Sequence, residues 1–373
     1  MRRRWAAGAG TRGRSIGLSR KGDEQLKRGA GHPSTGPAGP GRRFAAIALI
    51  GAALLLAAVL SLGVGYYALT PLQVVQAIGS RLGLYHGEVL PQALTVVFRS
   101  RMPRIIASVL IGGALSVSGA AYQGMFKNPL VAPEILGVAA GAGLGASIAI
   151  AGGFPYYMTQ VFAFVFGLAV VLIAYLISGR TTQLPTVSLV LAGVMLKTLC
   201  TSAISMIKYV ADPTDALPAI TFWLMGSLNK VTWDSLRFSL PMMAAGFLVL
   251  HLMRWRINLL TLDDEEAISL GANPRRDRIM VVVAATVLSA AAVCLGGIIE
   301  WVGFMIPHIA RMLFGSEYKY IVPASTLLGA LFLLAADGLA RSLLVMELPL
   351  SVLTSFVGAP FFIFLILRRT GRG

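Results

Sequence analysis

The chain has 373 residues, of which 56% are hydrophobic and only 13% charged, with a mean hydropathy of +0.75 and a formal net charge of +16. A soluble domain carries about twice this charged fraction, and several apolar runs reach the roughly 20 residues that a helix needs to cross a bilayer. The two cysteines, Cys200 and Cys294, lie in apolar runs, which fits neither a disulfide framework nor a zinc site. The sequence excludes an ordinary soluble protein and predicts an all-α polytopic membrane protein.

Residues 1–43 differ from the rest of the chain. They contain eleven Lys and Arg against Asp23 and Glu24, with many glycines and few apolar side chains. Such a segment cannot bury enough apolar surface to fold. We therefore expect a disordered, basic, cytoplasmic tail near anionic lipid headgroups rather than a nucleic-acid-binding arm, and a transmembrane domain over 44–373.

Hydropathy predicts about ten membrane-spanning helices after the tail. The shortest, 302–314, reaches only about 20 Å at 1.5 Å per residue, so we expect it to dip or bend with its neighbour. Lys and Arg concentrate in the segments on the side of the tail, which places both termini in the cytoplasm. The expected spans are 44–67, 103–125, 135–151, 158–178, 186–207, 236–253, 279–296, 302–314, 321–340 and 350–368.

The helical pattern is broken after the second span. Pro129 and Pro133 cannot continue a helix, because each lacks an amide hydrogen and clashes with the preceding turn. Broken backbone at membrane depth is tolerated where it is buried in protein or lines a cavity. Gly137, Gly141 and Gly145 follow on one helix face, which favours close packing of another backbone, whereas the break itself indicates a path.

A weak internal repeat accompanies this break. A shift of 178 residues pairs Gly119 with Gly297 and Pro129 with Pro307, in spans expected to run in opposite directions. Inverted repeats with broken helices near the midplane recur in transporters. The sequence therefore predicts broken helices, a weak inverted repeat and a role in transport.

Four blocks carry a family resemblance: RMPRIIASVLIGGALSVSGAAYQGMFKNPLVAPEILGVAAGAGLGA (101–146), VGFMIPHIARMLFG (302–315), ADGLAR (336–341) and ELPLSVLTSFVGAPFFIFLILRR (347–369). In order and spacing they resemble the FecCD-type permeases, the membrane subunits of ABC importers for ferric siderophores, haem and vitamin B12. The resemblance covers the chain from about residue 44 and makes 44–373 the permease domain.

The resemblance implies a homodimer of ten-helix subunits around one path in the bacterial inner membrane. It also implies two cytoplasmic ATP-binding subunits, a periplasmic substrate-binding protein, and neither a cofactor nor an enzymatic activity of this chain. The sequence agrees on one independent point. It has no G-x-x-x-x-G-K-[ST] phosphate loop, so ATP hydrolysis is expected on a separate subunit.

The loop 254–278 contains the signal of a short helix. Its acidic start suits a helix N-terminus, Gly271 suits a C-terminal cap, and Pro274 stops the helix. By resemblance this is the coupling helix that contacts the ATPase; a merely solvated loop helix is the alternative. The coupling residues are then Asp263, Asp264, Glu265, Glu266, Leu270 and Gly271.

Arg101, Arg104 and Arg341 lie on the expected outer side, against the usual charge bias. The family's permeases present arginines here to glutamates of the binding protein, and arginine suits a bidentate grip on carboxylates. The resemblance therefore implies a docking role for these three residues. Anchoring to lipid headgroups is the alternative.

Two further residues are candidates for the path. Lys197 lies inside the fifth span, where a charge is expected to face the bundle interior or water. It either borders the path and favours an anionic cargo, or pairs with a polar group. Thr186, by match to the family's loop before this span, is a candidate for the cytoplasmic gate.

The leading hypothesis is an importer permease for a ferric siderophore or similar iron complex, with haem, cobalamin or molybdate as alternative cargoes. An ion-coupled secondary transporter is a remote alternative, for which Glu300 and Asp337 are the available intramembrane acids. A membrane enzyme would need a nucleophile or metal cluster, and the four scattered histidines have no metal-ligand spacing. The sequence therefore predicts no catalytic residue and no metal site.

Overall fold

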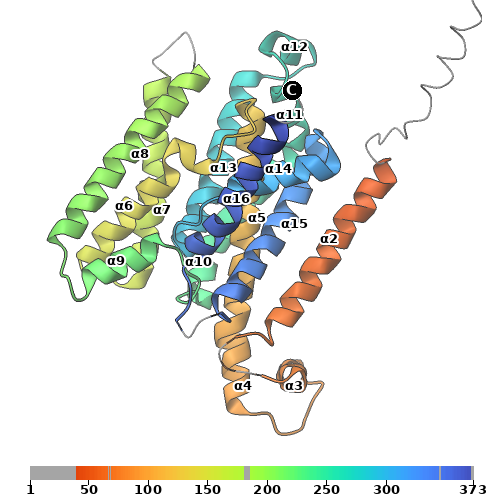
Figure 1. The fold of residues 1–373 in the computed structure, drawn as a ribbon, viewed down its shortest axis with the longest axis vertical. Helices are drawn as coiled ribbons and strands as arrows, with labels where there is room; N and C mark the ends of the chain where they lie inside the picture. The colour runs from red at the N-terminus through yellow and green to blue at the C-terminus, as the bar shows by residue number, and fades with distance from the viewer. Residues whose placement is uncertain (1–38, 66, 68, 180–184, 344–345, 371–373) are drawn as a thin grey trace, which may run out of the picture. The chain divides into compact units, whose positions relative to one another are not determined.

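The computed structural model describes residues 39–65, 67, 69–179, 185–343 and 346–370, and its regular structure over these ranges is entirely helical (Figure 1). Most of the predicted tail lies outside the described residues. The elements are α2 (Pro40–Ser61), α3 (Pro71–Arg81), α4 (Pro91–Thr95), the π-helix η1 (Val96–Arg101), α5 (Met102–Met125), the 3₁₀ helix η2 (Pro133–Leu136), α6 (Val138–Ala151), α7 (Tyr156–Ser178), α8 (Pro185–Val210), α9 (Ala216–Leu224), α10 (Trp233–Leu252), α11 (Arg254–Leu260), α12 (Asp264–Ser269), α13 (Pro274–Gly296), α14 (Val302–Phe314), α15 (Tyr318–Ala340) and α16 (Leu350–Thr370).

All ten expected spans correspond to helices of the described chain. Seven helical stretches are long and apolar enough to cross a membrane, and three shorter apolar helices, in α6, α14 and α16, match the remaining spans. The second span is longer than predicted, because α4, η1 and α5 continue each other over Pro91–Met125. The part before residue 103, about three turns, was missed because Arg99, Arg101 and Arg104 lower the hydropathy there.

Helix α5 lies at the centre of the bundle, where small residues let other helices come close. It packs against α13, α14 and α15, and most of its residues are buried. A methyl group on Gly119 would overlap the carbonyl oxygen of Gly303 in α14, and one on Gly112 would overlap that of Gly329 in α15. Close approach through small residues is the usual way in which membrane helices associate.

The break after α5 is present and leads into η2 and α6. Gly141 and Gly145 lie on α6 against α7, where a β-carbon on Gly141 would lie 2.7 Å from the carbonyl oxygen of Phe166. The packing interpretation is right for these two glycines. Gly137 has another role: its φ of +84° provides the left-handed turn between η2 and α6.

Helices α5 and α13 are antiparallel neighbours, as the predicted inverted repeat requires (Figure 1). The Tyr122 hydroxyl of α5 lies 2.8 Å from that of Thr286 in α13. The two breaks, however, do not coincide under the shift of 178 residues. The second break is the segment 297–301, and Pro307 lies inside α14. Because Pro307 has no amide hydrogen, the carbonyl of Gly303 lacks its helical hydrogen-bond donor. This carbonyl faces α5.

The two ends of the bundle differ. One end, called here the α12 end, carries α11, α12 and the turn after α5; the other, the α3 end, carries α3, α4 and the α15–α16 connection (Figure 1). Helix α2 packs against α15 and exposes leucines such as Leu55 and Leu56, which are 70% and 62% exposed. Such a surface suits contact with lipid.

Candidate functional site

Helix α12 forms where the sequence predicts a short acidic helix. It starts after Asp263 and ends before Gly271, whose φ of +82° allows the left-handed turn that closes it. Ala267 is buried against the bundle, whereas Ile268 and Leu270 are 60% and 58% exposed. The helix therefore presents an apolar edge at the α12 end that is available to a partner.

Two of the acids on α12 hold it to the bundle. Lys127, just after α5, lies 2.9 Å from Asp263, and Arg278 of α13 contacts Asp264 at 2.9 and 2.5 Å. The hydrogen bonds from Arg278 hold the pKa of the Asp264 carboxyl below its usual range. Glu265 and Glu266 are exposed. The coupling residues expected from sequence thus lie together, with two acids tethered and two accessible.

The predicted docking arginines meet at the α3 end, but inside the protein. The Arg104 guanidinium lies 2.8 Å from Asp337 of α15 and 2.7 Å from Glu347 in the α15–α16 connection. Arg101 donates hydrogen bonds to the carbonyls of Leu62 and Tyr67. These contacts join the N-terminal end of α5 to three other parts of the chain.

Arg341 belongs to the same network. It donates to Ser61 at the end of α2 and lies 3.5 Å from Asp337. Arg101, Arg104 and Arg341 are only 4%, 8% and 7% exposed. The structure therefore differs from the expectation of freely presented arginines, because carboxylates, carbonyls and a hydroxyl of the same chain already bind their guanidinium groups. The docking role itself stays a prediction.

A cleft of about 750 Å³ opens between α8, α9, α16 and the segment 297–301. The wall of the cleft is mainly apolar. It includes Leu224, the last residue of α9, Met225, which follows it, and Phe356 and Ile363 of α16. The hydroxyl groups of Thr221, Ser351 and Ser355 also line it. The ionisable residues that line the cleft are Lys208 and Glu300.

The exposed half of α8 is divided into a polar and an apolar stripe. With 3.6 residues per turn, Lys197, Thr201, Ser205 and Lys208 share one face, which ends at the cleft. The neighbouring stripe is apolar and exposed, with Leu191, Met195, Leu199 and Met206. A helix between a water-filled path and lipid needs such a division.

Lys197 is exposed on the polar stripe of α8, beside the first break. A β-carbon on Gly193, one turn earlier, would lie 2.6 Å from the carbonyl oxygen of Ile135 in η2. The Glu134 carboxylate of η2 interacts electrostatically with both Lys197 and Glu300. The two breaks and α8 thus bring three ionisable groups into one region.

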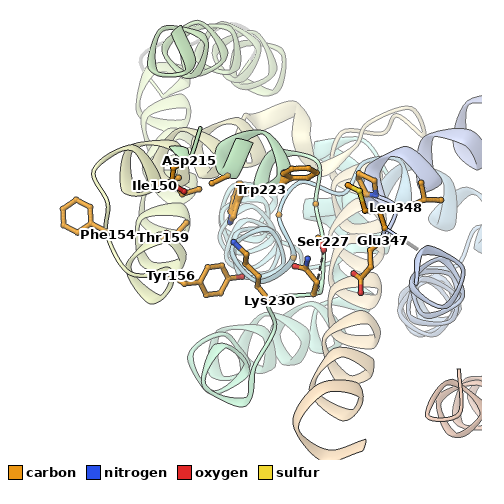
Figure 2. Close-up of a pocket in the computed structure, with 18 of the residues that line it drawn as sticks. Ile150, Phe154, Tyr156, Thr159, Asp215, Trp223, Ser227, Lys230, Glu347 and Leu348 are labelled. Carbon is orange, nitrogen blue, oxygen red and sulfur yellow. Dashed lines mark hydrogen bonds between the residues drawn. The ribbon is translucent and has the colours of Figure 1, made fainter. Parts of the chain in front are cut away.

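A second pocket, of about 780 Å³, lies at the α3 end on the other side of α9 (Figure 2). Tyr156, Trp223 and Lys230 surround it, and the Lys230 ammonium lies 5.9 Å from the centre of the Tyr156 ring. Glu347, the partner of Arg104, also lines it. The second pocket therefore adjoins the arginine network.

A junction of three backbone segments separates the cleft from the second pocket. Ser227 donates its amide to the carbonyl of Gly296, and Leu350 donates to that of Gly226. A β-carbon on Gly226 would lie 2.5 Å from the carbonyl oxygen of Ile298. The end of α9, the end of α13 and the start of α16 therefore hold one another at a fixed distance.

Several candidates from the sequence have other outcomes. The side chain of Thr186 lies outside the described residues, although the backbone there opens α8. Asp337 is fully buried between two arginines, which does not suit a free coupling acid. Among the described residues, no group of three or more His, Cys, Asp or Glu could hold a metal ion.

Sequence reasoning missed helix α9, the position of Lys208 in the lining of the cleft, and the electrostatic interaction of Glu134 with Glu300 and Lys197. The spacing of eleven residues between Lys197 and Lys208 could have indicated a shared helix face. Helix α9, at nine residues, is too short for a hydropathy window.

A family model described as the FecCD transport family matches residues 53–368. The chain belongs to this family. A molybdate import system permease protein, MolB, of Haemophilus influenzae is 38% identical over 321 residues, covering 85% of this chain and 94% of that protein. A probable iron chelatin transport system permease protein of Helicobacter pylori is 39% identical over 286 residues, covering 77% and 86%.

A solved metal-chelate type ABC transporter in an inward-facing conformation has the same fold, with a TM-score of 0.77, 34% identity, and coverage of 88% of this chain and 100% of that one. The FecCD-family chain described here is thus a multi-pass ABC importer permease, as the resemblance implies. The names of its relatives cover molybdate, iron chelates, haem and cobalamin.

Proposed function

We propose that two copies of this chain enclose one path of an ATP-driven importer in the bacterial inner membrane, with the α12 end and both termini in the cytoplasm. The observation that carries the proposal is the cleft of about 750 Å³, which one chain leaves open beside the polar stripe of α8. A second copy facing this cleft would turn it into an enclosed passage.

The two ends would then serve different partners. Two cytoplasmic ATP-binding subunits would receive α12, whose exposed Ile268 and Leu270 can enter a groove while Asp263 and Asp264 keep the helix attached to the bundle. A periplasmic substrate-binding protein would dock at the α3 end. Its carboxylates would have to replace Glu347 on Arg104.

The path would run along α8. Lys197, on the polar stripe, would border it, and Thr186, at the start of the same helix, would belong to the cytoplasmic gate. Lys197→Met is then expected to change the uptake rate. Unchanged uptake would show that this lysine has only a structural role.

A ferric siderophore or similar iron complex is the cargo that this cleft favours. Its mainly apolar wall and volume suit a bulky complex that can be desolvated in part, as haem and cobalamin also can. Molybdate is the second candidate because MolB is a relative, although a compact, hydrated dianion gains little from apolar walls. Ion-coupled secondary transport is disfavoured by the pairing of Asp337.

Uptake into proteoliposomes tests the proposal. The chain, its cognate ATPase and its binding protein would be reconstituted, and uptake of a radiolabelled ferric trihydroxamate, haem, cobalamin and molybdate compared. ATP-dependent uptake that stops with a hydrolysis-deficient ATPase supports an importer, and the accepted compound identifies the cargo. Uptake that needs no ATP but is collapsed by an ionophore would instead indicate a secondary carrier.

A further inference from the structure

Glu300 is an acidic residue exposed in the mainly apolar cleft. It forms no ion pair among the residues that the structure describes, whereas Asp337 and Asp277, the buried acids of the long helices, each contact an arginine. An unpaired carboxylate at membrane depth is unfavourable, so such residues tend to have a functional role.

The backbone fixes Glu300 in this position. The segment begins at Gly297, with φ +73°, and ends at Trp301, with φ +71°. A left-handed conformation is rare for a large aromatic residue, and such strain persists mainly at functional sites. Gly358 of α16 accommodates the Trp301 side chain, since a β-carbon there would lie 2.6 Å from it. The carboxylate is thus presented from a rigid turn.

The other charges of this region leave Glu300 uncompensated. Glu134 from the first break interacts electrostatically with Glu300 as well as with Lys197, so it adds a like charge near Glu300 instead of compensating it. Lys208 lines the same cleft from α8 but makes no ion pair with Glu300. The cleft thus has a carboxylate on one wall and an ammonium group on another, both available to a cargo.

We propose that Glu300 and Lys208 determine which charges a cargo can carry through the cleft. Glu300 attracts cationic groups or hydrogen-bond donors of a metal chelate and repels a compact dianion. Lys208 binds the anionic groups of the same chelate. This inference rests on the proposed path. It predicts that the chain discriminates between cargoes of similar size and different charge after the binding protein has released them.

Thiol labelling measures the charge of the cleft without any cargo. Ser355 lines it, so a Ser355→Cys reporter in a Cys200→Ala, Cys294→Ala background, purified as the full chain in nanodiscs, can react with a cationic or an anionic methanethiosulfonate. A neutral reagent corrects for thiol reactivity. When a unit charge about 8 Å from the reporter thiol is removed in water, the ratio of the labelling rates of the cationic and the anionic reagent changes about fivefold.

Glu300→Gln is expected to lower this ratio about fivefold and Lys208→Met to raise it similarly. Asp234→Asn is the matched control, because this exposed acid of α10 lies outside the cleft and pairs with Arg237; it should leave the ratio unchanged. A Glu300→Gln ratio equal to that of Asp234→Asn, with all variants monodisperse, overturns the inference.

Uptake gives the second readout. In the reconstituted importer, ferric trihydroxamates with a pendant ammonium or a pendant acetamide group would be compared. Glu300→Gln is expected to slow the cationic compound severalfold relative to the neutral one, and an unchanged ratio contradicts the inference. Absence of ATP-dependent uptake in the parent protein would instead overturn the proposed function, because the labelling ratios do not depend on it.

Discussion

Arg104 Nη1 lies 2.7 Å from Glu347 Oε1, and this contact joins the start of α5 to the connection that leads into the cleft-lining helix α16. Glu347 occupies the guanidinium on which a binding protein is expected to place a carboxylate. Three residues later, in the junction, Leu350 donates its amide to the carbonyl of Gly226. The contact site of Arg104 is therefore connected through this junction to the chain that lines the cleft.

Glu347→Gln should strengthen docking. The amide is a weaker competitor for the guanidinium than the carboxylate, so we expect an affinity for the cognate binding protein about fivefold higher, for a difference of ~1 kcal/mol. Surface plasmon resonance on the permease in nanodiscs measures this. Glu317→Gln, at the α12 end, is the control and should have no effect; weaker docking by Glu347→Gln would exclude competition.

Arg104→Met should destabilise the protein. It removes the closest partner of Asp337, which is fully buried and keeps only Arg341 at 3.5 Å. Breaking a buried pair costs about 3 kcal/mol, which corresponds to a loss of roughly 4 °C in apparent Tm for a chain of this length. Arg237→Met, which breaks an exposed pair, should change the Tm little. Equal Tm values for both variants would contradict the role of Arg104.

Gly119→Ala tests the crossing of α5 and α14. The added methyl group would overlap the Gly303 carbonyl oxygen, so the helices must separate, at a cost of about 1–3 kcal/mol. Gly338→Ala in α15 is the matched control, since nothing lies within 4 Å of its added β-carbon; it should be neutral or stabilising by about 0.5–1 kcal/mol. Thermal unfolding in detergent compares them, and equal stability would refute the crossing.

The attachment of α12 should depend on pH only in acid. Hydrogen bonds from Arg278 lower the pKa of Asp264 from its ordinary value of 3.8. The stabilisation is therefore complete above about pH 4 and is lost as the pH falls through the depressed value. Hydrogen exchange of the α12 amides should stay protected, after correction for intrinsic rates, from pH 7 to 5, whereas Asp264→Asn should lose protection throughout. Loss of protection between pH 7 and 5 in the parent would contradict this.

The sequence predicted the spans because long apolar runs leave a membrane protein little choice but helix. It also predicted α12, whose acidic start and Gly271 are local signals. Burial of Arg104 could not be predicted, because its partners Asp337 and Glu347 lie 233 and 243 residues away in the chain. Hydropathy likewise gave no sign of the short helix α9, although this helix lies between the cleft and the second pocket.

The two cleft charges illustrate the same limit. Glu300 could be recognised in the sequence as an acid within a membrane domain, but a secondary carrier and an importer both allow one. Its unpaired state and its rigid turn depend on Gly297, Trp301 and Gly358 together. Only tertiary structure brings these residues to one place.

The most direct test of the shared path is cross-linking between two copies. In the cysteine-free background, Ser355→Cys on the cleft should be joined by a short bis-maleimide into a dimer, with a yield that changes when ATP and vanadate trap the assembled transporter. Leu55→Cys, on the exposed face of α2, should give no dimer. A Ser355→Cys protein that stays monomeric in every state, or dimerises no more than Leu55→Cys, would contradict a passage enclosed by two chains.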